Sequence, residues 1–88
     1  MRRQHFVVTG RVQGVGFRYF CQEQAKRFGL VGYARNRPDG SVETEAEGDD
    51  AALEQFAQAI ARGPRAASVS NVTREERELK QEQGFRVG

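Results

Sequence analysis

Three glycines and an arginine stand close together near the start of the chain, in the run Gly10-Arg11-Val12-Gln13-Gly14-Val15-Gly16-Phe17-Arg18. Glycine permits positive φ angles and lets a ligand approach the backbone closely. A run of N–H groups in such a turn can point inward as a nest for an anion. If a helix begins after the turn, its free amides and its dipole add positive potential. These residue types therefore predict a site for a compact dianion such as a phosphoryl group.

Arg18 falls in the first turn of that expected helix, where a cation is disfavoured by roughly 0.3–1 kcal/mol. A bound anion would reverse this cost, and a guanidinium can contact phosphate through two parallel hydrogen bonds. The competing interpretation is a tight turn that needs its glycines, with Arg18 a solvated surface residue, and the residues alone leave both open. The run has no Walker lysine and lacks the third glycine of the dinucleotide pattern.

Other reactive side chains offer less. His5 stands alone near the terminus, and we expect it to be a strand or surface residue rather than a base or a ligand. Cys21 lies on an apolar stripe, so we expect it to pack in the core. No group of histidine, cysteine and aspartate has metal-ligand spacing, and we expect neither metal nor cofactor. Three glutamates share one face of a strand that we expect to be solvated: Glu43, Glu45 and Glu47.

Alternating apolar and polar residues predict strands over residues 5–12, 30–37 and 41–47. Between the last two, Pro38-Asp39-Gly40 predicts the tight turn of a β-hairpin. Phe85 and Val87 suggest a short final strand, whereas residues 68–78 are irregular because Val69 and Val72 break strict alternation. The stretch Thr73–Gln83 is charged enough to be helical or mobile.

Two segments have helical periodicity. The first runs from Phe17 to Phe28 and is ended by Gly29 as a C-terminal cap. The second begins after Asp49 or Asp50, either of which can accept hydrogen bonds from free amides, and ends at Gly63-Pro64. The amphipathic spacing of the first helix is carried by Phe17, Phe20, Cys21, Gln24, Ala25 and Phe28. The apolar stripe of the second is Leu53, Phe56, Ala57 and Ile60.

The resulting β-α-β-β-α-β order, with one more short strand, predicts a ferredoxin-like α+β sandwich, in which two helices cover one face of an antiparallel sheet of four to five strands. The 88 residues suffice for one domain spanning 1–88. A single cysteine excludes an intramolecular disulfide, and no apolar run suggests a signal peptide or a membrane span. We therefore expect a cytoplasmic monomer.

Charge is distributed unevenly along the chain. Residues 1–37 carry eight basic side chains and one acidic side chain, whereas residues 38–88 carry six basic and 11 acidic ones. A cationic N-terminal part favours an anionic partner, without distinguishing nucleic acid from a small phosphate.

The run from Gly10 to Arg18 resembles the signature of the acylphosphatase family, and so does the later run Gly32-Tyr33-Ala34-Arg35-Asn36-Arg37-Pro38-Asp39-Gly40-Ser41-Val42-Glu43, with Tyr33 where many members have tryptophan. The similarity covers nearly the whole chain. It implies a metal-independent hydrolase that cleaves acyl phosphates and binds inorganic phosphate or sulfate as a site ligand. It also implies five strands in the order 4-3-1-2-5, which would set the glycine-rich loop beside the second strand.

The resemblance also implies roles for individual residues. Arg18 would bind the substrate phosphate, and Asn36 would position the attacking water. The phosphate cradle would be completed by the backbone of Gln13, Gly14, Val15, Gly16, Phe17 and Arg18.

Three alternatives stay open. An RNA-binding module of this fold would stack bases on sheet aromatics, for which Phe6, Tyr33 and Phe85 are the candidates. We expect no nucleic-acid partner, because no RRM-like motif is present and a row of glutamates would repel the phosphate backbone. The second is a domain like that at the N-terminus of hydrogenase-maturation carbamoyltransferases, which are much longer chains. The third is a phosphate sensor with negligible turnover.

Overall fold

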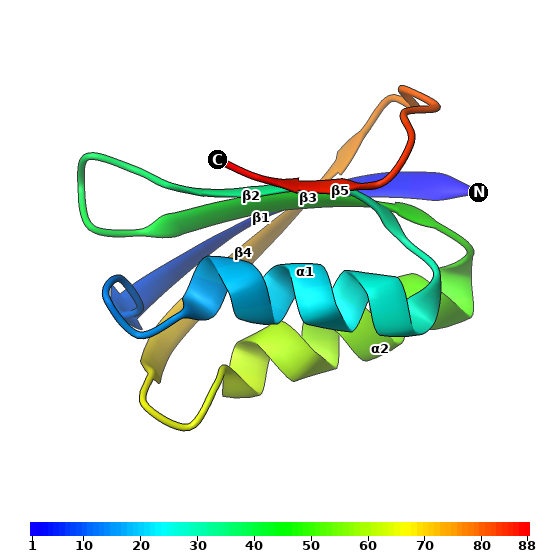
Figure 1. Ribbon diagram of the computed structural model, residues 1–88. Coiled ribbons are helices and arrows are strands. Elements are labelled where there is room, and N and C mark those ends of the chain that lie inside the picture. The colour runs from blue at the N-terminus through cyan, green and yellow to red at the C-terminus, as the bar shows by residue number, and fades with distance from the viewer.

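The computed structural model describes residues 1–88 and contains five strands and two helices in the predicted order (Figure 1). The elements are β1 Arg2–Arg11, α1 Phe17–Phe28, β2 Val31–Asn36, β3 Val42–Gly48, α2 Asp50–Arg62, β4 Ser68–Arg77 and β5 Phe85–Val87. Both helices lie on one face of the sheet, as predicted for a ferredoxin-like α+β sandwich. Neither helix is long and apolar enough to cross a membrane.

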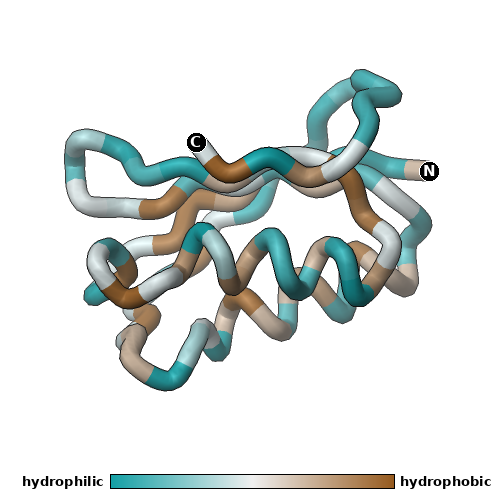
Figure 2. The backbone as a smooth tube through the Cα atoms, viewed as in Figure 1, coloured by the Kyte–Doolittle hydropathy of each residue, from teal (hydrophilic) through white to brown (hydrophobic).

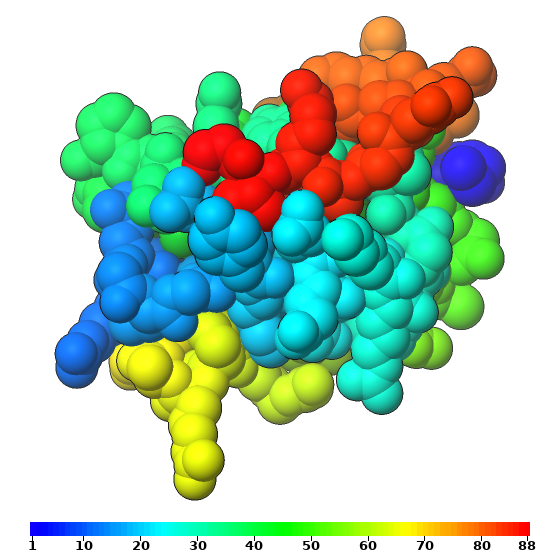
Figure 3. Space-filling model, viewed as in Figure 1, coloured from blue at the N-terminus to red at the C-terminus, as the bar shows by residue number.

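The strands are arranged in the order β4-β1-β3-β2-β5, so the expected order 4-3-1-2-5 is wrong. The connection through α1 carries the chain past one strand position, and the β2–β3 hairpin then places β3 in the gap between β1 and β2. Four strands pair antiparallel, but β5 pairs parallel with β2 at the edge, which makes the sheet mixed. The C-terminal residues therefore lie on the surface beside β2 (Figure 3).

A single cluster of buried apolar side chains lies between the sheet and the helices. Figure 2 shows that hydrophobic residues occur both in the strands and in the helices that enclose this layer. Phe56 of α2 lies edge-on to Phe6 of β1, with 5.6 Å between ring centroids. α1 begins and ends at the predicted residues. Asp49 caps α2, because its carboxylate accepts a hydrogen bond from the Ala52 amide at 2.9 Å.

The expectation that Thr73–Gln83 is helical or mobile is wrong as far as Arg77, because β4 continues to that residue. β4 is an edge strand whose residues are mostly exposed, so charged side chains are tolerated on it. Its register with β1 shifts between Thr9 and Gly10, which leaves Ser70 unpaired. This bulge explains why Val69 and Val72, separated by three positions, break the alternation.

The sheet face opposite the helices is not the solvated row of glutamates that we expected. The side chains of Glu43, Glu45 and Glu47 are only 12%, 7% and 1% exposed. Fully buried Arg3 covers Glu45 and Glu47 from β1, which begins at Arg2 rather than residue 5. Glu43 is paired instead with His5 and Arg35. The Arg3 guanidinium pairs with Glu45 at 2.5 Å, with Glu47 at 3.2 Å and with Glu82 at 2.7 Å.

The aromatic platform that an RNA-binding sandwich would need is absent from this face. Phe6 and Phe85 belong to the buried cluster on the helix side. Of the three candidates, only Tyr33 lies on the face opposite the helices, and its hydroxyl donates to Glu43 and Glu45. The sheet therefore lacks the set of stacking side chains by which this fold binds single-stranded RNA.

Candidate active site

The loop between β1 and α1 has the alternating backbone conformation of an anion nest. Gly14 and Gly16 have φ angles of 75° and 77°, whereas Val15 is not among the residues with positive φ. A Cβ added at either glycine would meet no other atom within 4 Å. These glycines are therefore required by the backbone conformation and not by crowding.

The backbone amides of this loop are free donors. No N–H group from Gln13 through Arg18 donates to a protein acceptor, and the first such bond of α1 runs from the Phe20 amide to the Gly16 carbonyl at 3.0 Å. The helix has no side-chain N-cap and no acidic residue in its first turn. Consecutive unpaired donors, together with the positive end of the helix dipole, form an environment that favours an anion.

Arg18 is half-buried and directed toward the edge of the sheet that carries β5. Its Nη1 donates to the Gly88 carbonyl at 2.5 Å, and the Gly88 amide donates to the Ala34 carbonyl at 2.9 Å. The guanidinium is therefore held against the main chain beside β2. A guanidinium has five N–H donors, so this single bond leaves most of them available.

The Gln13 side chain links the glycine-rich loop to the β2–β3 turn through two hydrogen bonds. Its side-chain amide donates to the carbonyls of Arg37 and Ser41, at 2.7 and 2.9 Å. The turn is itself fixed, since the Asp39 carboxylate accepts hydrogen bonds from the Ser41 amide and hydroxyl. Sequence reasoning placed Gln13 in the cradle by its backbone and missed this contact, because no local pattern predicts which main chain a glutamine will reach.

Asn36 is the last residue of β2 and lies opposite Val42. It shares the face of buried Ala34, because side chains two positions apart point to the same side of a strand. Asn36 is thus exposed on the helix side of the sheet, and its carboxamide makes no hydrogen bond within the chain. Arg18 and Asn36 make no direct hydrogen bond. The Gly88 main chain links the Arg18 side chain to β2 two residues before Asn36.

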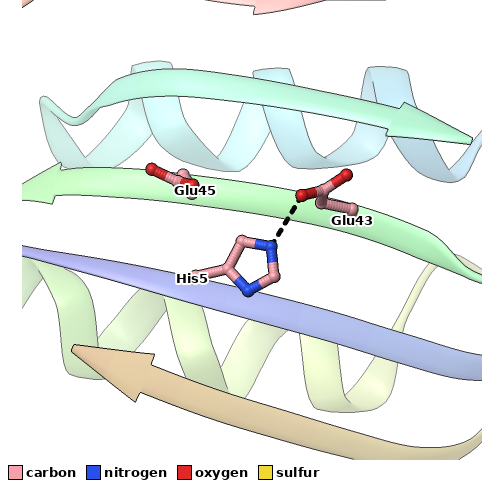
Figure 4. A group of neighbouring side chains, drawn as sticks. All are labelled: His5, Glu43 and Glu45. Atoms are coloured by element: carbon pink, nitrogen blue, oxygen red, sulfur yellow. Dashed lines mark hydrogen bonds and ion pairs between the residues drawn. The ribbon is translucent and has the colours of Figure 1, made fainter. Parts of the chain in front are cut away.

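A group with the composition of a metal site lies on the other face of the sheet (Figure 4). One ligand atom each from His5, Glu43 and Glu45 lies within 4.8 Å of the others. The carboxylate oxygens already accept hydrogen bonds from arginine, histidine and tyrosine: Arg35 and His5 at 2.6 and 2.7 Å on Glu43, Arg3 on Glu45, and Tyr33 on both. A cation would have to displace these donors.

Hydrogen bonds determine the ionisation of this group. Burial opposes the charge on Glu43, but hydrogen bonds from Arg35, His5 and Tyr33 outweigh it and lower the pKa of Glu43 to about 2. Burial and the two neighbouring carboxylates raise the pKa of the Tyr33 phenol, which stays a protonated donor. The group is therefore a compensated ion network.

Cys21 is fully buried against the sheet. Burial raises the pKa of the Cys21 thiol to about 12, so it is not a nucleophile at neutral pH.

Comparisons with known proteins agree with one another. The family model described as Acylphosphatase matches residues 4–87. A curated acylphosphatase of Geobacillus thermodenitrificans is 44% identical over 88 residues, covering 99% of this chain and 94% of the relative. The crystal structure of acylphosphatase from Bacillus subtilis superposes with a TM-score of 0.97 at 40% identity, covering 100% of this chain and 99% of that one.

A crystal structure of full-length HypF in its phosphate- and nucleotide-bound form is 26% identical with a TM-score of 0.88, but this chain covers only 12% of it. The assignment of this chain to a family therefore rests on the relatives of similar length. From the match of the family model over residues 4–87, the chain belongs to the acylphosphatase family.

Proposed function

We propose that this chain hydrolyses acyl phosphates to a carboxylate and inorganic phosphate, with the phosphoryl group held by Arg18 and by the amides from Gln13 to Arg18. The observation that carries this proposal is the run of unpaired amides from Gln13 to Arg18, which includes the two positive-φ glycines before α1. The names of the relatives of similar length support the same reaction.

An acyl phosphate is an activated mixed anhydride, so its cleavage needs positioning and charge stabilisation more than a strong base. The loop amides and the Arg18 guanidinium would neutralise charge on the three equatorial oxygens as the bond to the carboxylate lengthens. The bond from Arg18 to the Gly88 carbonyl would fix the guanidinium while its remaining N–H groups face the phosphate.

Asn36 would orient the attacking water through its carboxamide, which is free of other partners and exposed on the helix side. A carboxamide cannot remove a proton at neutral pH, so the proton would pass to a phosphate oxygen. No step uses a metal. In this proposal residues 1–88 work as a single acylphosphatase-like domain and a monomer, with inorganic phosphate as a product ligand of the same cradle.

The first test is benzoyl phosphate hydrolysis, followed by ultraviolet absorbance in the presence of EDTA. Asn36→Ala should lower turnover by about 100-fold, on the scale of losing one preorganised polar group, while inorganic phosphate still binds. Asn71→Ala is the matched control, because Asn71 is exposed on β4. Normal turnover in Asn36→Ala would remove Asn36 from the reaction, and the absence of hydrolysis by the folded natural chain would leave the cradle as a phosphate sensor.

Arg18→Ala should weaken both substrate and inorganic phosphate binding, because both ligands would use one cradle. Arg27→Ala, which removes an exposed arginine from the last turn of the same helix, should leave both affinities unchanged. Calorimetric titration with inorganic phosphate measures the effect directly. Equal phosphate affinity in Arg18→Ala and the natural chain would show that Arg18 does not contact the phosphate.

A further inference from the structure

A hollow of about 370 Å³ lies at the sheet edge formed by β2 and β5. It is lined by Tyr33, Ala34, Arg35, Lys80, Arg86 and Gly88. Tyr33 and Arg35 alternate with buried Ala34 along β2, so they project from the face opposite the helices. None of the six residues belongs to the glycine-rich loop, but Gly88 also accepts the hydrogen bond from Arg18, so the hollow and the proposed cradle share this residue. Figure 3 shows the C-terminal segment at this surface.

Three cationic side chains around the hollow have unused hydrogen-bond donors. Arg35 uses only Nε, on Glu43, and Arg86 uses only Nη2, on Glu82. Lys80 Nζ lies 4.0 Å from its nearest carboxylate oxygen and makes no hydrogen bond. The other guanidinium N–H groups and the ammonium therefore remain available to an incoming anion.

Contacts within the chain hold the main chain of Lys80 and the guanidinium of Arg35 in place. The amides of Lys80 and Gln81 donate to the two oxygens of the Glu47 carboxylate, at 2.8 and 3.1 Å, which anchors the main chain of the lysine to β3. The Arg35 guanidinium lies 5.6 Å from the centre of the Tyr33 ring. Because both contacts exist before a ligand arrives, less conformational entropy is lost when the ligand binds.

The cations of this region are exposed, whereas its acids are largely buried. The side chains of Arg35, Lys80 and Arg86 are 59%, 59% and 69% exposed. The acidic side chains beneath them are between 1% and 19% exposed and are paired with those cations or with buried Arg3: Glu43, Glu45, Glu47 and Glu82. The side chains of the region have little net charge, but those exposed around the hollow are positive donors, and the main-chain oxygen of Gly88 adds an acceptor to its lining.

We propose that this hollow binds a small polyanion, a molecule carrying at least two phosphate or carboxylate groups spaced to contact Lys80, Arg86 and Arg35 together. A single anionic group would meet one exposed cation at a time, and such contacts are weak. Several groups on one molecule engage the three cations at once, at the entropic cost of one association. This site goes beyond the proposed hydrolysis and does not depend on it.

The test uses tripolyphosphate and citrate as probes of the two anion types, with binding followed by calorimetry and by ¹H–¹⁵N NMR. The double variant Lys80→Ala/Arg86→Ala should weaken binding of at least one probe by about tenfold or more, since charge-assisted hydrogen bonds are lost. The matched control is Lys26→Ala/Arg27→Ala, which removes one lysine and one arginine from the last turn of α1. Arg86→Ala alone serves if the double variant is unstable.

In the natural chain, the probe should shift the amide resonances of residues 80 and 86, whereas inorganic phosphate should shift those of residues 13–18. Binding of tripolyphosphate alone would restrict the site to phosphates, and binding of citrate alone would restrict it to carboxylates. The proposal is overturned if neither probe binds, if both probes shift only residues 13–18, or if the control variant loses as much affinity as the test variant.

Discussion

Gly16 immediately precedes α1 with a φ of 77° and a ψ of 21°, a left-handed conformation that L-residues adopt at a cost of about 1–2 kcal/mol. Gly16→Ala should therefore destabilise the fold by about that amount. It should also disturb the free amides of the loop and lower turnover on benzoyl phosphate by about tenfold or more, because each preorganised donor contributes strongly to stabilising developing charge. Urea denaturation and steady-state kinetics measure the two effects.

Gly29 provides a matched control within the same helix. It has a φ of 71°, and a Cβ added there would meet no other atom within 4 Å, so Gly29→Ala introduces the same strain at the opposite end of α1. This variant should lose stability but keep its turnover. If both variants lose activity in proportion to stability alone, the positive-φ turn is structural and the loop amides have no part in catalysis.

At this scale, the sequence predicted backbone behaviour better than side-chain contacts. Glycines between a strand pattern and a helix pattern predict a positive-φ turn at the helix start, because few other residues tolerate it. The contacts of Arg18 with Gly88 and of Gln13 with Arg37 join segments 70 and 24 positions apart. Such contacts depend on how β5 and the hairpin pack beside α1, which no local spacing records.

Glu43 joins three strands of the sheet, since it accepts hydrogen bonds from His5 of β1 and from Tyr33 and Arg35 of β2. A carboxyl whose pKa falls from 4.5 to about 2 on folding contributes stability above pH 4.5 and loses it as the pH falls through about 2. The full contribution is on the order of 3 kcal/mol, at about 1.4 kcal/mol per pKa unit.

Glu43→Gln should therefore be less stable than the natural chain at pH 7, and the difference should shrink by about 2 kcal/mol at pH 3, where part of the contribution has already been lost. Urea denaturation at the two pH values measures this change. Glu23→Gln, on the exposed surface of α1 where no ion pair forms, should show no such dependence. A pH-independent difference between the natural chain and Glu43→Gln would mean that the ion pairs around Glu43 do not lower its pKa.

Element prediction succeeded where one face of a segment is apolar and failed where burial is polar. The helices and the β2–β3 hairpin have apolar periodicity and were predicted nearly to their ends. The start of β1 and the end of β4 consist of charged residues that pair across the sheet, so their patterns resemble exposed loops. For the same reason the sequence pattern did not indicate that Glu45 and Glu47 are buried. Their burial depends on Arg3 and on the main chain of Lys80 and Gln81, more than 30 residues later.

For the whole molecule, the uneven charge of the sequence is largely compensated by the topology. β1 lies between β3 and β4, so basic residues of the N-terminal part meet acidic residues of the later part. The pairs include Arg2 with Glu76, Arg3 with Glu45, and Arg35 with Glu43. Arg18 pairs with no acidic side chain and contacts only the main-chain oxygen of Gly88, so within the proposed cradle it is the cation available to an external anion.

Cys21 can report on opening of the whole fold, because the residue has 0% exposure and burial raises the pKa of its thiol to about 12. A thiol reagent should therefore modify it only when the fold opens, at a rate set by the population of open molecules. Inorganic phosphate that binds the folded chain alone lowers this population by the factor 1 + [L]/Kd, so phosphate at ten times its Kd should slow modification about 11-fold.

Arg18→Ala should open at its own rate but lose this protection by phosphate, whereas Arg27→Ala should keep it. Mass spectrometry of iodoacetamide-treated samples gives the rate for each variant at matched phosphate concentration and ionic strength. Undiminished protection in Arg18→Ala would place the bound phosphate away from Arg18. Protection that vanishes in Arg18→Ala, with Cys21 still buried, would locate phosphate binding at the start of α1 and show that occupancy of this loop stabilises the molecule as a whole.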